Sequence, residues 1–406
     1  MFYLCNRVRK KWKKQISESA HEATPGKEAS FSFIDSYVKG KRIVMLGESS
    51  HGVGDYQTAK IELIRYLHDN HGFHVVVLEN GFMETTLCHD LLSEYSLEKK
   101  VQTACLDIYH TEEMLPLFDV EWGKRLHLTG MDVQPTYPNV SRHVQMWLQK
   151  NVDLTISEEY KELDKRFFDL DEQIRLKVKK RQKPQVEDTM HRYERFLALF
   201  DEYINAHQDH HPRMLKAIRR GILNRIEWLQ VCMKGYFSSG ALRSAFMFKN
   251  LEWLIEDYYK DEKMIIWAHN YHITKSRTIA NWLIKMKPVG EALTEKYHDE
   301  VYCIGLYAGS GEMASYLRVN LGVADLKKRY LESLFYKLYS GYLFLDLTGA
   351  RESSKRMWYQ RKWELLEMGK YPKRMSPQQA YDAILFINEV SVPTYLPVPN
   401  RDDKDV

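Results

Sequence analysis

Short apolar runs recur along this chain, and the first ones end next to charged residues. Ile43 to Leu46 is followed by Gly47 and Glu48, and Val75 to Leu78 closes on Glu79. Segments in which apolar residues recur at helical spacing separate the runs. Strands that alternate with helices predict βαβ units, which build a mainly parallel sheet flanked by helices. An α/β fold is therefore expected.

The same pattern continues at residues 126–130, 264–268, 302–307, 342–345 and 383–387, which brings the expected number of strands to about seven. Between Val140 and about Lys260 the chain is different, because long stretches have apolar residues at helical spacing. We interpret this segment as a large helical insertion or cap that covers the C-terminal ends of the strands. The expected division is an N-terminal half of the α/β core at 1–138, the helical insertion at 139–262, and a C-terminal half of the core at 263–406, together forming one catalytic unit.

Charge and cysteine content argue against several classes of protein. The chain carries 59 basic and 55 acidic residues, a formal net charge of +4, which is far from the strongly basic character of a nucleic-acid-binding protein. Its five cysteines are widely spaced and never form a Cys-x-x-Cys pair, so neither a disulfide framework nor a zinc ribbon is expected. No apolar run has the length of a signal-peptide core or of a membrane span. We therefore expect a cytoplasmic protein that binds neither nucleic acid nor membrane.

Four of the expected strands end on residues suited to acid–base chemistry: Glu48 with His51, Glu79, Asp132, and His269 with His272. Because the carboxyl ends of parallel strands lie at one edge of a sheet, these side chains are expected to meet in one cleft. A single carboxylate at such a position often caps the next helix, and this alternative applies to Asp132. For His272 the alternative is a supporting role behind the reacting groups.

A cluster of this composition can activate water. A neutral imidazole can take a proton from water, and a carboxylate on its other nitrogen fixes the tautomer and stabilises the cation that forms. A second imidazole can donate to the charge that develops on the substrate. Two histidines and two glutamates could instead bind zinc or manganese, although a His-Glu-x-x-His helix is absent. Metal-free water activation without a cofactor is the first hypothesis, and a divalent metal is the alternative.

Several of these segments resemble the erythromycin esterase family. The similar motifs are GESSHG at 47–52, GF at 72–73, GMD at 130–132, WAHNYH at 267–272, LDL at 345–347 and YDA at 381–383, in the order of that family. The resemblance extends over roughly residues 40–390. It implies a hydrolase that opens the lactone of macrolide antibiotics such as erythromycin and so confers macrolide resistance.

The resemblance also implies roles for individual residues. His51 would be the general base on water, with Glu48 and Glu79 around it and His269 close by. Lys60 and Arg243 would lie in the cleft, where related proteins carry basic residues.

The sequence departs from the family pattern at one position, and two alternatives to a macrolide esterase remain. The family often has an aspartate after the arginine, whereas this chain has Ser244, which concerns substrate preference more than chemistry. Some homologues are named as polysaccharide biosynthesis proteins. A metal-dependent hydrolase of another ester or amide, or a non-catalytic homologue linked to polysaccharide biosynthesis, therefore stands beside the macrolide esterase. If the protein is an enzyme, its expected partner is a small-molecule substrate, either a macrolide or another ester.

Overall fold

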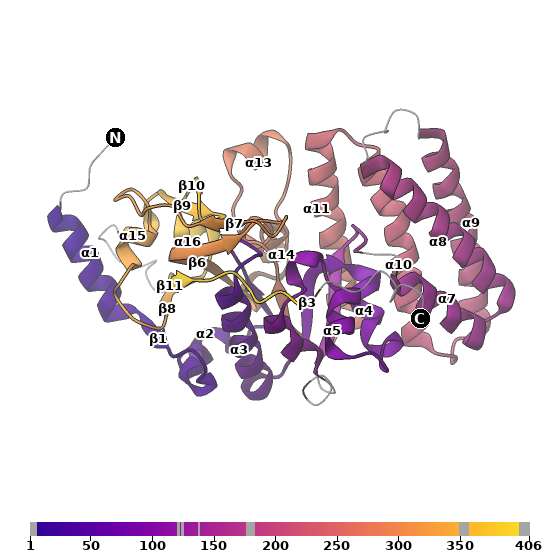
Figure 1. Ribbon diagram of the computed structural model, residues 1–406, viewed down its shortest axis with the longest axis horizontal. Coiled ribbons are helices and arrows are strands. Elements are labelled where there is room, and N and C mark those ends of the chain that lie inside the picture. The colour runs from indigo at the N-terminus through magenta and orange to yellow at the C-terminus, as the bar shows by residue number, and fades with distance from the viewer. Residues whose placement is uncertain are drawn as a thin grey trace.

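A central β-sheet with helices on both faces and a helical bundle at one end form the computed structural model (Figure 1). The structure describes residues 6–119, 122, 126–136, 139–175, 183–348 and 357–397. The strands of the central sheet are β1 (His21–Ala23), β2 (Ile43–Leu46), β3 (Phe73–Gly81), β4 (His127–Asp132), β5 (Lys263–Trp267), β6 (Val301–Ala314), β7 (Asn320–Gly322), β8 (Tyr342–Asp346) and β11 (Ala383–Val390). A separate hairpin consists of β9 (Trp363–Glu367) and β10 (Tyr371–Met375).

The central sheet has nine strands in the order β1-β8-β11-β6-β2-β5-β3-β4, and β7 pairs with the end of β6. Neighbours from β11 to β4 are parallel, whereas β8 is antiparallel to β11, β1 to β8, and β7 to β6. The expected α/β fold with a mainly parallel sheet is confirmed. All seven runs predicted as strands lie in this sheet.

Helical segments connect the strands and build the insertion. They are α1 (Asn6–Ser19), η1 (Glu28–Ile34), α2 (Asp35–Val38), α3 (Gly54–His71), α4 (Phe82–Leu91), α5 (Leu97–Ala104), η2 (Asp107–Tyr109), η3 (Glu112–Phe118), α7 (Asn139–Asn151), α8 (Leu154–Arg175), α9 (Lys183–Ala206), α10 (Pro212–Cys232), α11 (Tyr236–Trp253), η5 (Leu254–Tyr258), α12 (Asn270–Ile273), α13 (Ile279–Leu283), α14 (Val289–Tyr297), η6 (His298–Glu300), α15 (Glu332–Phe335), η7 (Trp358–Gln360) and α16 (Pro377–Ala380). Among the described helices, none is long and apolar enough to cross a membrane.

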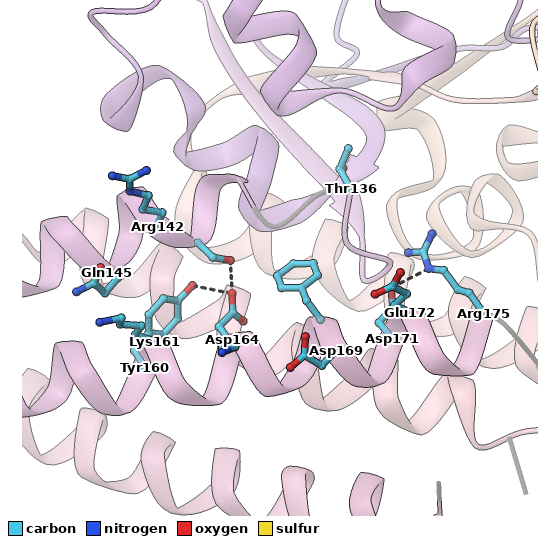
Figure 2. Close-up of a pocket in the computed structure, with 13 residues that line it drawn as sticks. Thr136, Arg142, Gln145, Tyr160, Lys161, Asp164, Asp169, Asp171, Glu172 and Arg175 are labelled. Carbon is cyan, nitrogen blue, oxygen red and sulfur yellow. Dashed lines mark hydrogen bonds and ion pairs between the residues drawn. The ribbon is translucent and has the colours of Figure 1, made fainter. Parts of the chain in front are cut away.

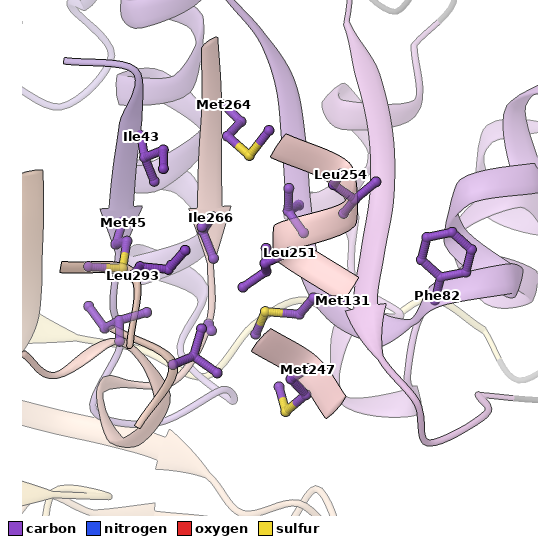
Figure 3. Packing of buried hydrophobic residues seen from close by; sticks show 14 of the residues in the cluster. Ile43, Met45, Phe82, Met131, Met247, Leu251, Leu254, Met264, Ile266 and Leu293 are labelled. Atoms are coloured by element: carbon purple, nitrogen blue, oxygen red, sulfur yellow. The ribbon is translucent and has the colours of Figure 1, made fainter. Parts of the chain in front are cut away.

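The strands are apolar without interruption because both faces of the sheet are covered. Ile43 and Met45 belong to one core cluster, and the alternating Val44 and Leu46 belong to the cluster on the other face. Figure 3 shows the first cluster, in which side chains of β2 and β5 lie beside side chains of α11 and α14. A strand buried on both faces reads as a continuous apolar run, which is why these strands could be predicted.

The segment interpreted as an insertion is helical throughout its described part. Its helices α7 and α10 pack against α4 (Figure 1), while α11 contacts β4. The side-chain amide of Asn250 on α11 donates a hydrogen bond of 2.9 Å to the carbonyl of Met131 in β4. Helix α11 is therefore the part of the insertion that reaches the strand ends. The three-part division of the chain stays a proposal, with α7 beginning at Asn139 and β5 at Lys263.

The expectation that a strand closes on Glu79 needs a correction. Strand β3 continues to Gly81, and its register against β4 shifts between Leu78 and Gly81. Glu79 therefore lies at an irregularity inside the strand. Such bulges redirect side chains and are frequent beside functional sites.

Candidate active site

His51 and Glu48 form an imidazole–carboxylate pair in the loop after β2. The Nδ1 atom of His51 lies 2.6 Å from Oε1 of Glu48. The Glu48 side chain is completely buried, whereas 25% of the His51 side chain is exposed. In the described part of the chain, no group hydrogen-bonds the Nε2 atom of His51. With its Nδ1–H donated to the carboxylate, the imidazole keeps Nε2 as a proton acceptor, the arrangement that a general base requires.

Both oxygens of Glu48 are held by further donors. The hydroxyl of Tyr109 donates to Oε1 over 2.6 Å, and the indole N–H of Trp267 donates to Oε2 over 3.1 Å. The buried ammonium of Lys60 donates to the same Oε2 and lies 3.8 Å from the centre of the Trp267 ring. The carboxylate is thus fixed in position by its neighbours.

The charges of this group are set by burial and by one another. Burial alone would raise the pKa of Glu48, but the Lys60 charge and the His51 hydrogen bond hold it at about 2. Burial lowers the pKa of Lys60 to about 8, against the opposing effect of Glu48. The pKa of His51 is lowered by burial but raised more strongly by the hydrogen bond of Glu48 and the charge of Glu79, so it lies above its usual value. Glu48 is therefore ionised at neutral pH.

Glu79 connects the two histidines that follow β5. One carboxylate oxygen accepts the backbone N–H of His269 over 2.8 Å, and the other lies 3.1 Å from Nε2 of His272. Burial would raise the pKa of Glu79, but the neighbouring His272 and the charges of His51 and Arg243 hold it well below its usual value. Glu79 is thus a second buried carboxylate beside an imidazole.

The hydrogen bonds of His269 define its tautomer. Its Nδ1 accepts the backbone N–H of Tyr271 over 3.0 Å, so the proton is on Nε2, which donates to the carbonyl of Ser49 over 3.1 Å. Burial and the charge of His51 lower the pKa of His269 to about 3. The ring is therefore neutral, and its centre lies 5.2 Å from that of His51.

Asp132 and Arg243 form a third charged pair, at the end of β4. The Nε atom of Arg243 donates to Oδ1 of Asp132 over 3.0 Å, and the other guanidinium arm contacts Oδ2. Asp132 also accepts the backbone N–H of Gln134 over 3.0 Å. Burial lowers the pKa of Arg243, but Asp132 more than offsets this and raises it. The neighbouring Ser244 is buried and donates to the carbonyl of Lys287 over 2.6 Å.

The structure brings the eight predicted site residues into three linked pairs or groups: Glu48 with His51 and Lys60, Glu79 with His269 and His272, and Asp132 with Arg243. Register links the last two groups, because Gly81 of β3 is paired with Asp132 of β4. Sequence reasoning did not find Tyr109 or the indole of Trp267. Tyr109 lies in the short helix η2, which no strand-end signal marks, whereas Trp267 is the first residue of the WAHNYH motif.

The carboxylates of this site do not fit a metal ion as they stand. Each oxygen of Glu48 accepts hydrogen bonds from protein groups, and one of these groups is an ammonium, which would repel a cation. Within the described residues, no group of three or more His, Cys, Asp or Glu side chains is arranged to hold a metal. The arrangement instead suits proton transfer.

A cavity of about 970 Å³ lies between α7 and α8 (Figure 2). Its lining includes Tyr160 and Phe168, with Asp164 held by the hydroxyl of Tyr160 over 3.4 Å. None of the eight predicted site residues lines it. Thr136, which does line it, accepts the backbone N–H of Gly81 over 3.1 Å. We place the candidate active site at the histidine–carboxylate groups, because perturbed pKa values and convergent polar atoms occur there.

Gly47 begins the loop that carries Glu48 and His51, and a Gly47→Ala change is expected to disturb it. A Cβ atom at this position would overlap the side chain of Asn270, the first residue of α12. The overlap is expected to lower the free energy of unfolding by about 1–3 kcal/mol and to reduce activity, because α12 carries His272. Urea unfolding measures the first effect. Gly240→Ala, where a Cβ meets no atom within 4 Å, is the control and should be neutral or slightly stabilising.

The fold and the site together define an α/β protein with imidazole–carboxylate pairs at the carboxyl ends of parallel strands, the place where α/β enzymes bind their substrates. Residues 68–390 match the family model described as erythromycin esterase. The chain therefore belongs to the erythromycin esterase family, and the resemblance inferred from its motifs is confirmed. The matched range begins after the loop that carries Glu48 and His51.

Similar proteins cover nearly the whole chain. YbfO of Bacillus subtilis is 24% identical over 411 residues, which is 94% of this chain and 92% of YbfO. A crystal structure of a succinoglycan biosynthesis protein has a TM-score of 0.76 and 18% identity, and covers 97% of this chain and 100% of that one. A mutant of the erythromycin esterase EreC in its open conformation has a TM-score of 0.70 and 17% identity, and covers 94% of this chain and 100% of that one. At these identities the two solved structures show a shared fold.

Proposed function

We propose that this protein hydrolyses an ester by general-base attack of water, with the lactone of an erythromycin-type macrolide as the substrate. The observation that carries the proposal is the His51–Glu48 pair, in which Nδ1 is 2.6 Å from the carboxylate. Membership of the erythromycin esterase family supports both the reaction type and the substrate class. An enzyme with this activity would confer macrolide resistance.

In the proposed reaction, Nε2 of His51 takes a proton from water as the water oxygen attacks the carbonyl carbon of the ester. Glu48 stabilises the imidazolium that forms, and Lys60 keeps Glu48 ionised. The tetrahedral intermediate then collapses, the bond between the carbonyl carbon and the alcohol oxygen breaks, and His51 returns the proton to that oxygen. The products are a carboxylic acid and an alcohol, which for a lactone belong to one opened ring.

Of the remaining residues, Glu79 and His269 belong to the catalytic group, and His272, Arg243 and Asp132 are assigned to substrate binding. Glu79 holds the backbone of His269 and the ring of His272 through its two oxygens. His269 contributes a neutral imidazole beside His51. His272 on α12 and Arg243 on α11 are assigned to face the negative charge that develops on the carbonyl oxygen. Asp132 fixes the direction of the Arg243 guanidinium.

Purified protein incubated with erythromycin is expected to yield a product heavier by the mass of one water, detected by mass spectrometry. The expectation follows from ring opening without loss of any part of the molecule. The His51→Gln protein is the control for background hydrolysis. An unchanged mass with the wild-type protein would exclude the macrolide, and a panel of simple esters would then test the wider hydrolase assignment.

Chelation separates the proposal from a metal-dependent hydrolase of another ester or amide. Activity is expected to survive dialysis against EDTA, because the carboxylates already accept hydrogen bonds from protein donors. Loss of activity with rescue by a divalent cation would instead favour the metal. Stabilisation by erythromycin against heat, without hydrolysis of any ester, would favour a non-catalytic homologue. The fold shared with a succinoglycan biosynthesis protein is the reason for testing this alternative.

A further inference from the structure

The turn of the β9–β10 hairpin lies against the loop that carries His51. Met368 and Gly369 have φ angles of 50° and 64°, and the backbone N–H of Lys370 donates to the carbonyl of Glu367 over 3.1 Å. Met368 and Gly369 are thus the corners of a tight turn within the three-residue connection between Glu367 and its strand partner Tyr371. The N–H of Met368 donates to the carbonyl of Ser49 over 2.7 Å. The left-handed conformation of Met368 costs energy, and such residues recur at functional sites.

Glu367, the last residue of β9, places a buried carboxyl group beside His269. One oxygen accepts the hydroxyl of Tyr307 over 3.1 Å. The other oxygen is buried and has no hydrogen-bond partner in the described part of the chain. It lies 4.0 Å from Nε2 of His269, the atom that donates to Ser49. Two acceptors therefore lie on the protonated side of this imidazole.

A buried carboxyl oxygen without a partner needs an explanation, because it costs free energy. The Glu367 side chain is 12% exposed, and burial raises its pKa to about 6, with Lys373 and Tyr307 opposing the shift. The charged and titratable groups around it come from several elements: Lys373 of β10, Tyr307 of β6 with Tyr381 behind it, Tyr56 of α3, Glu332 of α15, and His269. Lys373 makes no hydrogen bond to Glu367: its buried ammonium has no hydrogen-bond partner in the described chain and lies 5.2 Å from the centre of the Tyr271 ring.

We propose that Glu367 is a positioning residue that acts through His269, as a second acceptor for the imidazole Nε2–H beside the carbonyl of Ser49. This inference rests on the proposed ester hydrolysis, in which His269 stands next to the base His51. Glu367 and His269 then form a second imidazole–carboxyl pair, supplied by a hairpin outside the central sheet. A small rotation of the ring would exchange a neutral acceptor for a carboxylate, and hydrogen bonds to charged acceptors are the stronger ones.

The proposal makes the acid side of the pH profile depend on two groups. His51 must lose its proton to act as a base, and Glu367 must lose its proton to hold His269. Below both pKa values, log(kcat/KM) of the wild-type protein is then expected to rise with a slope of nearly two over about one pH unit, the range in which the roughly 10-fold contribution of the Glu367 charge is gained. In Glu367→Gln the slope is expected to be one, with kcat lower by about 10-fold from loss of the charged acceptor. A residue that only supports the fold would not change the slope.

Matched variants and a substrate-free measurement complete the test. Glu364→Gln, on the opposite face of β9, should keep the wild-type slope, and Glu367→Asp should restore a slope of nearly two. Ionisation of a buried carboxyl works against folding, so Glu367→Gln should be no less stable than wild type as pH rises through 6. A wild-type slope and rate in an active Glu367→Gln protein would overturn the role of Glu367 and leave the hydrolase standing.

Nuclear magnetic resonance of the ring nitrogens tests the pair without any substrate. The His269 signals, assigned by comparison with a His269→Gln protein, are expected to shift in a step near pH 6 in the wild type. The step should be absent from Glu367→Gln. If no ester is hydrolysed, the proposed function fails while this step can still be present. If the wild type shows no step, the pairing itself is wrong, whether or not Glu367→Gln folds.

Discussion

A His51→Gln variant is expected to hydrolyse its ester substrate with a kcat/KM about 10²–10⁴-fold lower than the wild type, the range that positioned acid–base groups contribute. The Nδ1 atom of His51 is held by Glu48 at 2.6 Å, and in the proposed reaction its Nε2 takes the proton of the attacking water. Glutamine accepts no proton at neutral pH, so water would attack without a base. Initial rates over a range of substrate concentrations measure the loss.

The same imidazole gives the sign of the pH dependence. Burial lowers the pKa of His51, but Glu48 and Glu79 raise it more, so its pKa lies above the usual value of a histidine. The base must be neutral, and activity is therefore expected to fall as the pH drops through this raised pKa. His191→Gln, on the exposed side of α9, is the control and should keep both rate and profile. A His51→Gln rate within about tenfold of wild type would contradict the role of the base.

The strands that could be predicted are those whose burial is evident from a continuous run of apolar residues. The run Ile43 to Leu46 is buried on both faces and became β2 with the same bounds. The strands that were missed, β1, β7, β9 and β10, depend on tertiary context. Strand β7 is largely exposed and has three residues, and β10 contains Pro372 and is mostly exposed. Such strands form because a neighbour provides a partner for their backbone, and their own residues give little signal.

The residues of the candidate site also divide into those that a sequence pattern indicates and those that only the tertiary structure reveals. Glu48, Glu79, Asp132 and His269 could be found because they follow apolar runs whose ends meet at one edge of the sheet. Lys60 and Arg243 lie on helices, and only the resemblance to a family pointed to them. Tyr109 and Glu367 belong to a short helix and to a hairpin, and only the fold places them beside an imidazole. Contacts between distant loops have no periodicity from which they could be predicted.

Lys60→Met is expected to lower the free energy of unfolding by about 3–5 kcal/mol, because it removes the ammonium that is the strongest counter-charge of the buried Glu48 carboxylate. Both side chains of the pair are completely buried, so solvent cannot screen the stranded carboxylate. Methionine retains the length of the side chain, which separates loss of charge from loss of packing. Urea unfolding at pH 7 measures the change. Lys14→Met removes the exposed pair with Glu18 and should cost about 0–1 kcal/mol.

The cause of that loss can be tested by removing the second charge. In Lys60→Met/Glu48→Gln, much of the stability should return, whereas activity should stay low because His51 has lost its carboxylate partner. The difference in stability between the wild type and Lys60→Met should also depend on pH. In the wild type, the pKa of Glu48 is lowered from 4.5 to about 2, so the stability it contributes is present above pH 4.5 and is lost as pH falls towards 2. In Lys60→Met, only His51 still opposes the effect of burial on that pKa, and the penalty of the variant should therefore shrink as acid protonates Glu48. A penalty that did not shrink at low pH would mean that packing, and not the buried charge, accounts for the loss.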